Sequence, residues 1–172
     1  AAGIEIRAKY SLIAEGTRGS ITKIIEKKLS LRKNSDPQKY GLGFKEVWRL
    51  DKNKHHPGLV EHSLGWPLEN DAGGGSFTYH YGEDLVSLGF VVHLDYSNPY
   101  LSPFDEFQSF KTHPKIKNLL AGAKRISYGA RAINEGGIQS WPELAFPGGV
   151  LIGCSAGMVN VPRIKGTHNA MK

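Results

Sequence analysis

The sequence predicts an α+β fold in which a central antiparallel sheet with packed helices is flanked at both ends by strand and helix segments. Two observations carry this prediction. Several strand-like runs fill the middle of the chain, and turn residues at Pro57-Gly58, Asn70-Asp71 and Gly82 connect them, which favours an antiparallel meander. Apolar residues at helical spacing interrupt these strands and also precede them.

The first elements are expected to be a strand and a helix. Apolar residues alternate through residues 3–16, which predicts a strand that ends at Gly16. Isoleucines and a leucine then recur at helical spacing over residues 20–29, and Ser20 is the expected N-cap of that helix. The strands of the middle sheet are expected at residues 40–50, 59–66, 76–81, 84–96 and 124–132.

Two short helices are expected among these strands. Ser102 followed by Pro103 is typical of a helix start, so residues 102–114 predict the first helix. Its three phenylalanines are interpreted as core residues in preference to ligand contacts; they are Phe104, Phe107 and Phe110. Residues 114–122 predict a second short helix, and residues 148–153 predict a short buried strand.

The two ends of the chain share a strand–loop–helix pattern. This pattern predicts that the ends form one domain and that the middle is an inserted second domain, with segments 1–36, 37–145 and 146–172. The sequence lacks an initiator Met and stops one turn into its last expected helix. We therefore expect it to be a segment of a longer protein.

The composition, with 40% hydrophobic and 22% charged residues, is that of a globular protein. The net charge of +6 is concentrated in the first third of the chain, but no aromatic residue interleaves with the lysines of Lys23–Lys33. We interpret this stretch as a solvated helix face and expect no nucleic acid partner. The single cysteine, Cys154, excludes an internal disulfide, and no run reaches the roughly 18 apolar residues of a membrane-spanning helix.

Three motifs invite a functional interpretation. The stretch from Gly153 onward predicts the end of a strand, a loop with Pro162, and a helix that starts at Gly166. Free backbone N–H groups converge at the start of that helix, which suits an anionic or cofactor oxygen. The alternative interpretation is an ordinary helix cap. The same stretch contains "GCSAG", which fits the G-x-S-x-G pattern of hydrolases around Ser155, although a long loop follows where a nucleophile elbow needs a helix.

The third motif is "DAGGGSFTYH", in which three glycines precede a strand. They make either a flexible hairpin or a stretch of bare backbone on which a ligand can lie. The seven histidines, among them His93, lack the spacing of a metal site. We therefore predict no metal ligands, and no catalytic residue is assigned from these motifs.

Several long stretches carry a resemblance to a known family; they include "AEGTRG", "YGLGFKEVW", "GGSFTYH", "LGFVVHLDYSNPYLSPFDEFQ", "KRISYGARAINEGGIQS" and "FPGGVLIGCSAGMVNVPRIKGTHNAMK". Together they resemble the electron-transfer flavoprotein–ubiquinone oxidoreductase family, whose FAD domain is of the glutathione-reductase type. The resemblance implies that residues 1–36 and 146–172 are parts of that FAD domain. It also implies that residues 37–145 are a ubiquinone-binding domain.

The resemblance also implies site residues. Those near FAD are Glu15, Gly16, Gly153, Cys154, Gly166, Thr167 and His168, and those near the quinone are Gly74 and Gly75. Two positions depart from the family pattern. Cys154 stands where related flavoproteins carry an Asp that holds the ribityl chain, and Gly73 stands where the family often has an aromatic residue. The second departure is expected to loosen the quinone pocket.

By resemblance, the intact protein takes electrons from electron-transfer flavoprotein through a [4Fe–4S] cluster and FAD to ubiquinone, in fatty acid and amino acid oxidation. It is expected to lie on a membrane surface without spanning it, at the mitochondrial inner membrane or the bacterial cytoplasmic membrane. The segment has neither "GxGxxG" nor four cysteines, so we expect it to bind FAD weakly or not at all and to be inactive alone. A geranylgeranyl-reductase-like or hydroxylase-like FAD enzyme and a non-enzymatic membrane- or partner-binding module are the alternatives.

Overall fold

The computed structural model describes residues 3–172, which divide into two compact units. The central unit is Tyr40–Ala132, and the terminal unit combines the chain up to Lys39 with the chain from Ile133 onward. Each unit has its own sheet and its own buried hydrophobic cluster.

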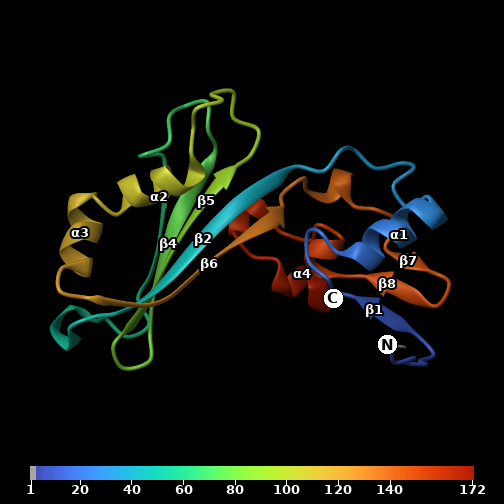
Figure 1. Ribbon diagram of the computed structural model, residues 1–172, viewed down its shortest axis with the longest axis horizontal. Coiled ribbons are helices and arrows are strands. Elements are labelled where there is room, and N and C mark those ends of the chain that lie inside the picture. The colour runs from blue at the N-terminus through green and yellow to red at the C-terminus, as the bar shows by residue number, and fades with distance from the viewer. Residues whose placement is uncertain (1–2) are drawn as a thin grey trace. The chain divides into compact units, whose positions relative to one another are not determined.

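The central unit is built on a five-stranded sheet with strand order β3-β4-β5-β2-β6 (Figure 1). The neighbours β3, β4, β5 and β2 pair antiparallel. Gly82 has a positive φ of 61° and makes the tight turn between β4 and β5 that its lack of a Cβ favours. The strands are β2 (Tyr40–Arg49), β3 (Val60–Leu64), β4 (Gly74–Tyr81), β5 (Leu85–His93) and β6 (Lys124–Asn134).

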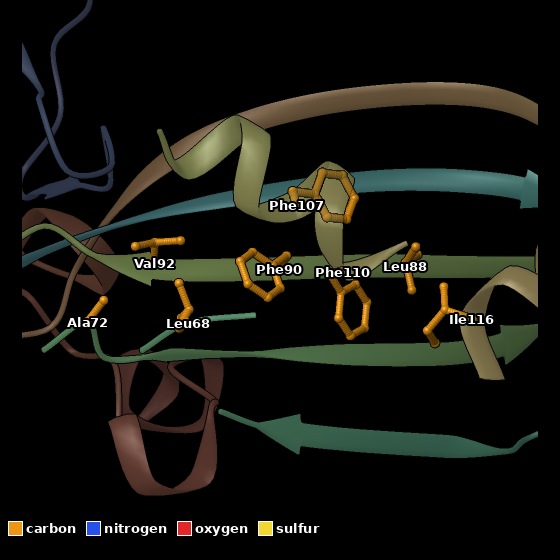
Figure 2. Packing of buried hydrophobic residues seen from close by; sticks show 8 residues of the cluster. All are labelled: Leu68, Ala72, Leu88, Phe90, Val92, Phe107, Phe110 and Ile116. Carbon is orange, nitrogen blue, oxygen red and sulfur yellow. The ribbon is translucent and has the colours of Figure 1, made fainter. Parts of the chain in front are cut away.

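Two helices, α2 (Pro103–Phe110) and α3 (Pro114–Leu120), pack on one face of this sheet (Figure 2). The expected cap is present, because the Ser102 hydroxyl accepts a hydrogen bond from the backbone N–H of Asp105. Together with the antiparallel sheet, these helices confirm the predicted α+β fold. They meet the sheet at a cluster made of Leu68, Ala72, Leu88, Phe90, Val92, Phe107, Phe110 and Ile116.

The core prediction for the phenylalanines of α2 is right for two of the three. Phe107 and Phe110 are buried, and their rings stack beside Phe90 with centroid separations of 6.1 and 5.3 Å. Phe104 is 55% exposed and meets Phe44 edge-on. The prediction is wrong for Phe104, because the α2 face that packs on the sheet carries Phe107 and Phe110.

A buried carboxylate ties α2 and β6 to β2. Glu46 is 3% exposed, and its oxygens lie 3.0 Å from both Lys111 Nζ and Arg125 Nη1. The indole N–H of Trp48 donates to the same carboxylate at 2.9 Å, and Lys111 Nζ also lies 4.8 Å from the centre of the Phe107 ring. This network compensates the charge that β2 buries under the helices.

The terminal unit has a three-stranded sheet with strand order β1-β8-β7 (Figure 1). Its elements are β1 (Ser11–Ile13), α1 (Ser20–Leu29), β7 (Ala145–Phe146), β8 (Gly149–Leu151) and α4 (Thr167–Met171). β1 pairs parallel with β8, although the two are far apart in sequence. The buried cluster of this unit consists of Leu31, Leu151, Ala156 and Met158.

Two expectations for the start of the terminal unit are wrong. The strand expected over residues 3–16 is only Ser11–Ile13, because its partner β8 offers three paired residues. The N-cap of α1 is Gly19 and not Ser20. The Glu15 carboxylate accepts hydrogen bonds from N–H groups of the first turn, so it takes over the role expected of a capping serine.

The structure also moves the second segment boundary. Residues 133–145, expected in the middle domain, belong to the terminal unit. Their polar side chains and backbone bond to that unit: Asn134 Nδ2 donates to the Cys154 carbonyl at 2.6 Å, and Trp141 Nε1 donates to the Gly157 carbonyl at 2.9 Å. Every helix within residues 3–172 is too short or too polar to cross a membrane.

Candidate functional site

The glycine run lies where β4 begins, on the edge of its pairing with β3. The backbone N–H of His93 donates to the Gly73 carbonyl at 2.9 Å. Hydrogen-bonded and non-hydrogen-bonded pairs alternate in an antiparallel ladder, so Gly75 and Val91 form the next bonded pair. The peptide groups of Gly74 are therefore directed away from β5 and toward the β3 side.

On that side, β3 has already ended. Its last paired residue is Leu64, which lies opposite Gly75, so Gly74 is one position beyond the β3 ladder. The same register sets Gly74 opposite Gly65, where the chain leaves β3 with a positive φ of 84°. The end of a strand ladder is a place where a ligand oxygen can bond to main-chain groups.

The sheet itself also requires these glycines. A Cβ at Gly74 would lie 2.1 Å from the Val91 carbonyl oxygen, and a Cβ at Gly75 would lie 2.6 Å from the Ser63 carbonyl oxygen. Close strand packing within β4 is therefore sufficient to explain the two residues, whereas the sequence suggested a flexible hairpin or a ligand surface. Protein atoms fill the space where a side chain would stand at both glycines, so a ligand can approach them only through their peptide groups.

Gly73 has a different neighbour. A Cβ there would lie 2.7 Å from Nδ1 of His93, so the imidazole ring rests on the bare Cα of Gly73. Sequence reasoning missed this contact, because His93 and Gly73 are brought together only by the β4–β5 register. The three-glycine run was the one available signal that a ring lies against this backbone.

Apolar side chains border Gly75. Leu64 is 80% exposed and Trp66 is 52% exposed. Both also line a pocket of about 200 Å³ between β3, β4 and the two helices. Its other lining residues combine charged, hydroxyl, imidazole and apolar groups; they are Glu61, His62, Ser63, Ser76, Thr78, Phe110, His113, Lys115 and Ile116.

In the terminal unit, Glu15 has a structural role. Its carboxylate accepts from the backbone N–H of Thr22 at 2.7 Å, from the Thr22 hydroxyl at 2.9 Å and from the N–H of Ile21 at 3.3 Å. The backbone N–H of Thr22 is the main cause that lowers the pKa of Glu15 below its usual value. Gly19 makes room for this carboxylate, since a Cβ there would lie 2.4 Å from Oε2.

The structure brings Gly16 and Gly153 into one neighbourhood. The Ser155 hydroxyl donates to the Gly16 carbonyl at 3.3 Å, and the N–H of Ile152 donates to the Ile13 carbonyl at 3.0 Å. Both glycines have a positive φ, and apart from their adjacent residues no atom of residues 3–172 lies within 4 Å of a Cβ built at either. The backbone here is exposed to a ligand on the side where a side chain would stand.

The last predicted residues lie close to the same loop. Gly166 caps α4, and Asn169 Nδ2 donates to the Met158 carbonyl at 3.0 Å, which joins α4 to the segment that follows Gly153. Thr167 is exposed and His168 is half-buried. α4 has five residues, so it presents only a single turn of backbone N–H groups.

Two other chemistries find no support. Ser155 is 4% exposed and is bonded to the Gly16 carbonyl, whereas the nucleophile of a G-x-S-x-G elbow must be accessible at the top of a sheet. Within residues 3–172, no three His, Cys, Asp or Glu side chains are arranged to hold a metal ion.

Two solved structures share this fold. A flavin-dependent brominase has a TM-score of 0.66 and 18% identity, covering 99% of this chain and 42% of its own. A geranylgeranyl bacteriochlorophyll reductase-like protein from Thermoplasma acidophilum has a TM-score of 0.67 and 17% identity, covering 96% of this chain and 38% of its own. At such low identity, the likeness concerns the fold alone.

Sequence comparison is more specific. Mitochondrial electron transfer flavoprotein-ubiquinone oxidoreductase from Sus scrofa is 60% identical and the Pseudomonas aeruginosa protein of that name is 55% identical, each over 99% of this chain. The chain spans 28% and 31% of the lengths of these two relatives. The family model described as "ETF-QO, ubiquinone-binding" matches residues 40–133, which is more than half of the chain and one residue longer than the central unit. The chain therefore belongs to the ETF-QO ubiquinone-binding family.

Proposed function

We propose that the protein containing this chain transfers electrons from electron transfer flavoprotein to ubiquinone, and that the central unit binds the quinone. The observation that carries the proposal is the position of Gly74, whose peptide groups lie past the end of β3. A quinone carbonyl accepts a hydrogen bond from a backbone N–H, and fixed N–H dipoles stabilise the charge that reduction places on its oxygen. Gly75 is the next residue of β4 and is paired with Val91.

The apolar part of the quinone has a matching surface. Leu64 contacts Gly75, and both Leu64 and Trp66 are largely exposed and line the pocket of about 200 Å³. An isoprenoid tail buried against them gains roughly 25 cal/mol for each Å² of apolar surface removed from water. This surface supports a quinone with a tail over a small polar substrate.

The residues of the terminal unit fit one side of a flavin. Gly16 and Gly153 have open space where a side chain would be, and both lie within one neighbourhood of the loop after β8. With FAD bound, Glu15 fixes the start of α1, and Gly16, Gly153 and Cys154 form the backbone beside the ribityl chain. Gly166, Thr167 and His168 present the start of α4 to the pyrimidine end. The flavin supplies the two-electron redox chemistry.

A [4Fe–4S] cluster does not fit this chain, because Cys154 is its single cysteine and the cluster needs four ligands. Its ligands are assigned to other parts of the protein. The site of action is the surface of the mitochondrial inner membrane in a eukaryote or of the cytoplasmic membrane in a bacterium. The mitochondrial and bacterial relatives support both alternatives.

The test uses the full-length protein, electron transfer flavoprotein as donor, and ubiquinones with and without a long tail. Gly74 and Gly75 are poor positions to mutate, because any Cβ collides with the sheet. Leu64→Ala and Trp66→Ala remove exposed side chains instead, and each is expected to raise the KM for the long-tailed quinone about tenfold. Tyr128→Ala, at a 79% exposed side chain on β6, is the matched control and leaves KM unchanged.

Three outcomes would contradict the proposal. A full-length protein that does not reduce ubiquinone at all excludes the function. A flavin spectrum without iron–sulfur absorption would instead favour the reductase or hydroxylase class, to which the Thermoplasma acidophilum protein points by fold alone. A protein that takes up no flavin would favour a binding module.

A further inference from the structure

The face of the central sheet that lies under the helices becomes polar at β3 and β4. Leu88 and Phe90 of β5 belong to the buried cluster on this face. Their partners on β4 are Thr78 and Ser76, and Ser76 in turn pairs with Ser63 of β3. Thr78 and Ser76 are 4% and 6% exposed. Because most buried hydroxyls in native proteins have a hydrogen-bond partner, these positions call for one.

The hydroxyls on this face have donors to spare. Ser63 Oγ and Ser76 Oγ lie 2.5 Å apart, and either can donate to the other. Each hydroxyl carries one proton, so the bond between them uses one proton and leaves the second available. The Thr78 hydroxyl makes no hydrogen bond to any of residues 3–172. Two O–H donors therefore lack an acceptor in the described part of the chain.

These three hydroxyl residues line the pocket of about 200 Å³. Phe110 and Ile116, which face the sheet in Figure 2, line it from the helix side. Leu64 and Trp66 are its exposed apolar lining residues, and they suit an isoprenoid tail. A hydrocarbon tail cannot accept a hydrogen bond, so it would leave the inner hydroxyls unpaired. The polar interior therefore indicates a different ligand, one that has acceptor atoms.

The pocket carries no net charge. Its lining contains one acidic and one basic side chain, Glu61 and Lys115, which form an ion pair between β3 and α3. Nδ1 of His113 accepts from the backbone N–H of Lys115 at 3.3 Å. The neutral imidazole of His113 therefore carries its proton on Nε2, which adds a further donor to the lining. Balanced charge and surplus donors favour a neutral ligand with oxygen acceptors.

The size of the pocket restricts the ligand further. An apolar cavity of about 150 Å³ holds benzene, so a pocket of about 200 Å³ admits a substituted six-membered ring. We propose that this pocket is a second ligand site, for a neutral ring that carries ether or carbonyl oxygens, the chemistry of a quinone head. It is separate from the peptide groups of Gly74, because Gly74 is not one of the residues that line it.

The experiment measures binding to the full-length protein by equilibrium dialysis. The probes are veratrole, a benzene ring with two adjacent methoxy groups, and ortho-xylene, which has methyl groups in their place. Thr78→Val replaces the hydroxyl by a methyl group of similar size. The Kd of veratrole is therefore expected to rise about fivefold, and the Kd of ortho-xylene to stay within about twofold. Ser76→Ala is expected to show the same selectivity, and Thr112→Val, at an exposed threonine after α2, changes neither Kd.

Two further measurements use the same Thr78→Val variant. Without ligand, its urea midpoint is expected to be no lower than that of wild type, because the substitution breaks no hydrogen bond within the protein. Its kcat and KM for a short-chain ubiquinone stay unchanged, because the proposed reaction site is at Gly74.

Each measurement can overturn the inference. An unchanged Kd of veratrole in Thr78→Val, or an equal rise for ortho-xylene, would mean that the hydroxyl does not bond to a ligand. A lower urea midpoint would give the Thr78 hydroxyl a structural role. A lost activity with short-chain ubiquinone would make this pocket and Gly74 one site. Dialysis requires no electron transfer, so the second ligand site stands or fails independently of whether wild type reduces ubiquinone.

Discussion

The two units differ in the size of their buried hydrophobic cores. In the central unit, Leu88, Phe90 and Val92 are fully buried under α2 and α3 as part of a cluster of eight buried residues (Figure 2). In the terminal unit, the buried cluster has four residues, Leu31, Leu151, Ala156 and Met158. Because burial of apolar surface is the main favourable term in folding, the difference indicates that the central unit carries most of the chain's own stability.

The largest expected loss of stability is tested with a matched pair of fully buried leucines, Leu88 in the central core and Leu151 in the terminal core. Leu88→Ala should lower the free energy of unfolding of the central unit by about 4 kcal/mol, from lost burial and the cavity that remains. Amide hydrogen exchange of β4 and β5 should then accelerate about a thousandfold. Leu151→Ala should leave the exchange of these strands unchanged, because it belongs to the other core.

The outcome decides whether the comparison holds. If Leu151→Ala accelerates exchange in β5 as strongly as Leu88→Ala does, the two units unfold as one and the central unit is not the more stable part.

A smaller effect is expected from Glu46, whose charge is buried between Lys111 and Arg125. Glu46→Gln leaves Lys111, which is itself 14% exposed, without its counter-charge, so it should cost about 3 kcal/mol in urea unfolding. Lys115→Gln removes an ion pair to Glu61 whose partners are 62% and 35% exposed, and should cost less than about 1 kcal/mol. Equal costs would mean that the burial of Glu46 is not what stabilises α2 on the sheet.

The smallest expected effect is a pH dependence that distinguishes the units. His80 is 4% exposed, and burial followed by the charges of His55 and His56 lowers its pKa, with Glu61 opposing. The backbone N–H of His56 donates to its Nδ1 at 3.2 Å. The unfolded chain therefore binds this proton more readily than the folded one. Stability is fully present above about pH 6.5 and is lost as pH falls from there through the folded-state pKa.

The terminal unit responds in a lower range. Because the pKa of Glu15 is lowered in the folded state, its carboxylate stabilises the terminal unit above the ordinary pKa of a glutamate. This contribution is lost as pH falls through the folded-state pKa of Glu15. Hydrogen exchange at pH 7.5, 6.0 and 4.0 should therefore weaken β4 before α1. His80→Gln should remove the loss of protection of β4 between pH 7.5 and 6.0. If that loss persists in the variant, His80 is not its cause.

Local patterns predicted most of the central unit. Alternation and turn residues located the strands, and Ser102-Pro103 located the start of α2, because these features depend on residues close in sequence. The boundary near residue 133 was not predictable in this way. It depends on Asn134 and Trp141 bonding to carbonyls of Cys154 and Gly157, which are contacts between separate segments.

At the candidate site, too, local sequence predicted some features, while others depend on contacts between distant segments. The glycine run marked the place from sequence, and family resemblance assigned Gly74 and Gly75. His93 was missed, because its place between Gly41 and Gly73 follows from the pairing of β5 with β2 and β4. For Glu15, the sequence pointed to a ligand neighbourhood, whereas its hydrogen bonds to Thr22 and Ile21 require the loop to fold back on α1.

The pairing of β1 with β8 has a consequence for biosynthesis. Ser11 is paired with Gly149, so the ribosome must add about 140 residues after β1 before its partner exists, which takes roughly ten to thirty seconds at usual elongation rates. The five strands of the central sheet emerge within this interval and can close their core first. During translation, β1 is therefore the segment that waits longest with an unpaired edge, and a chaperone that protects the nascent chain would be needed there most.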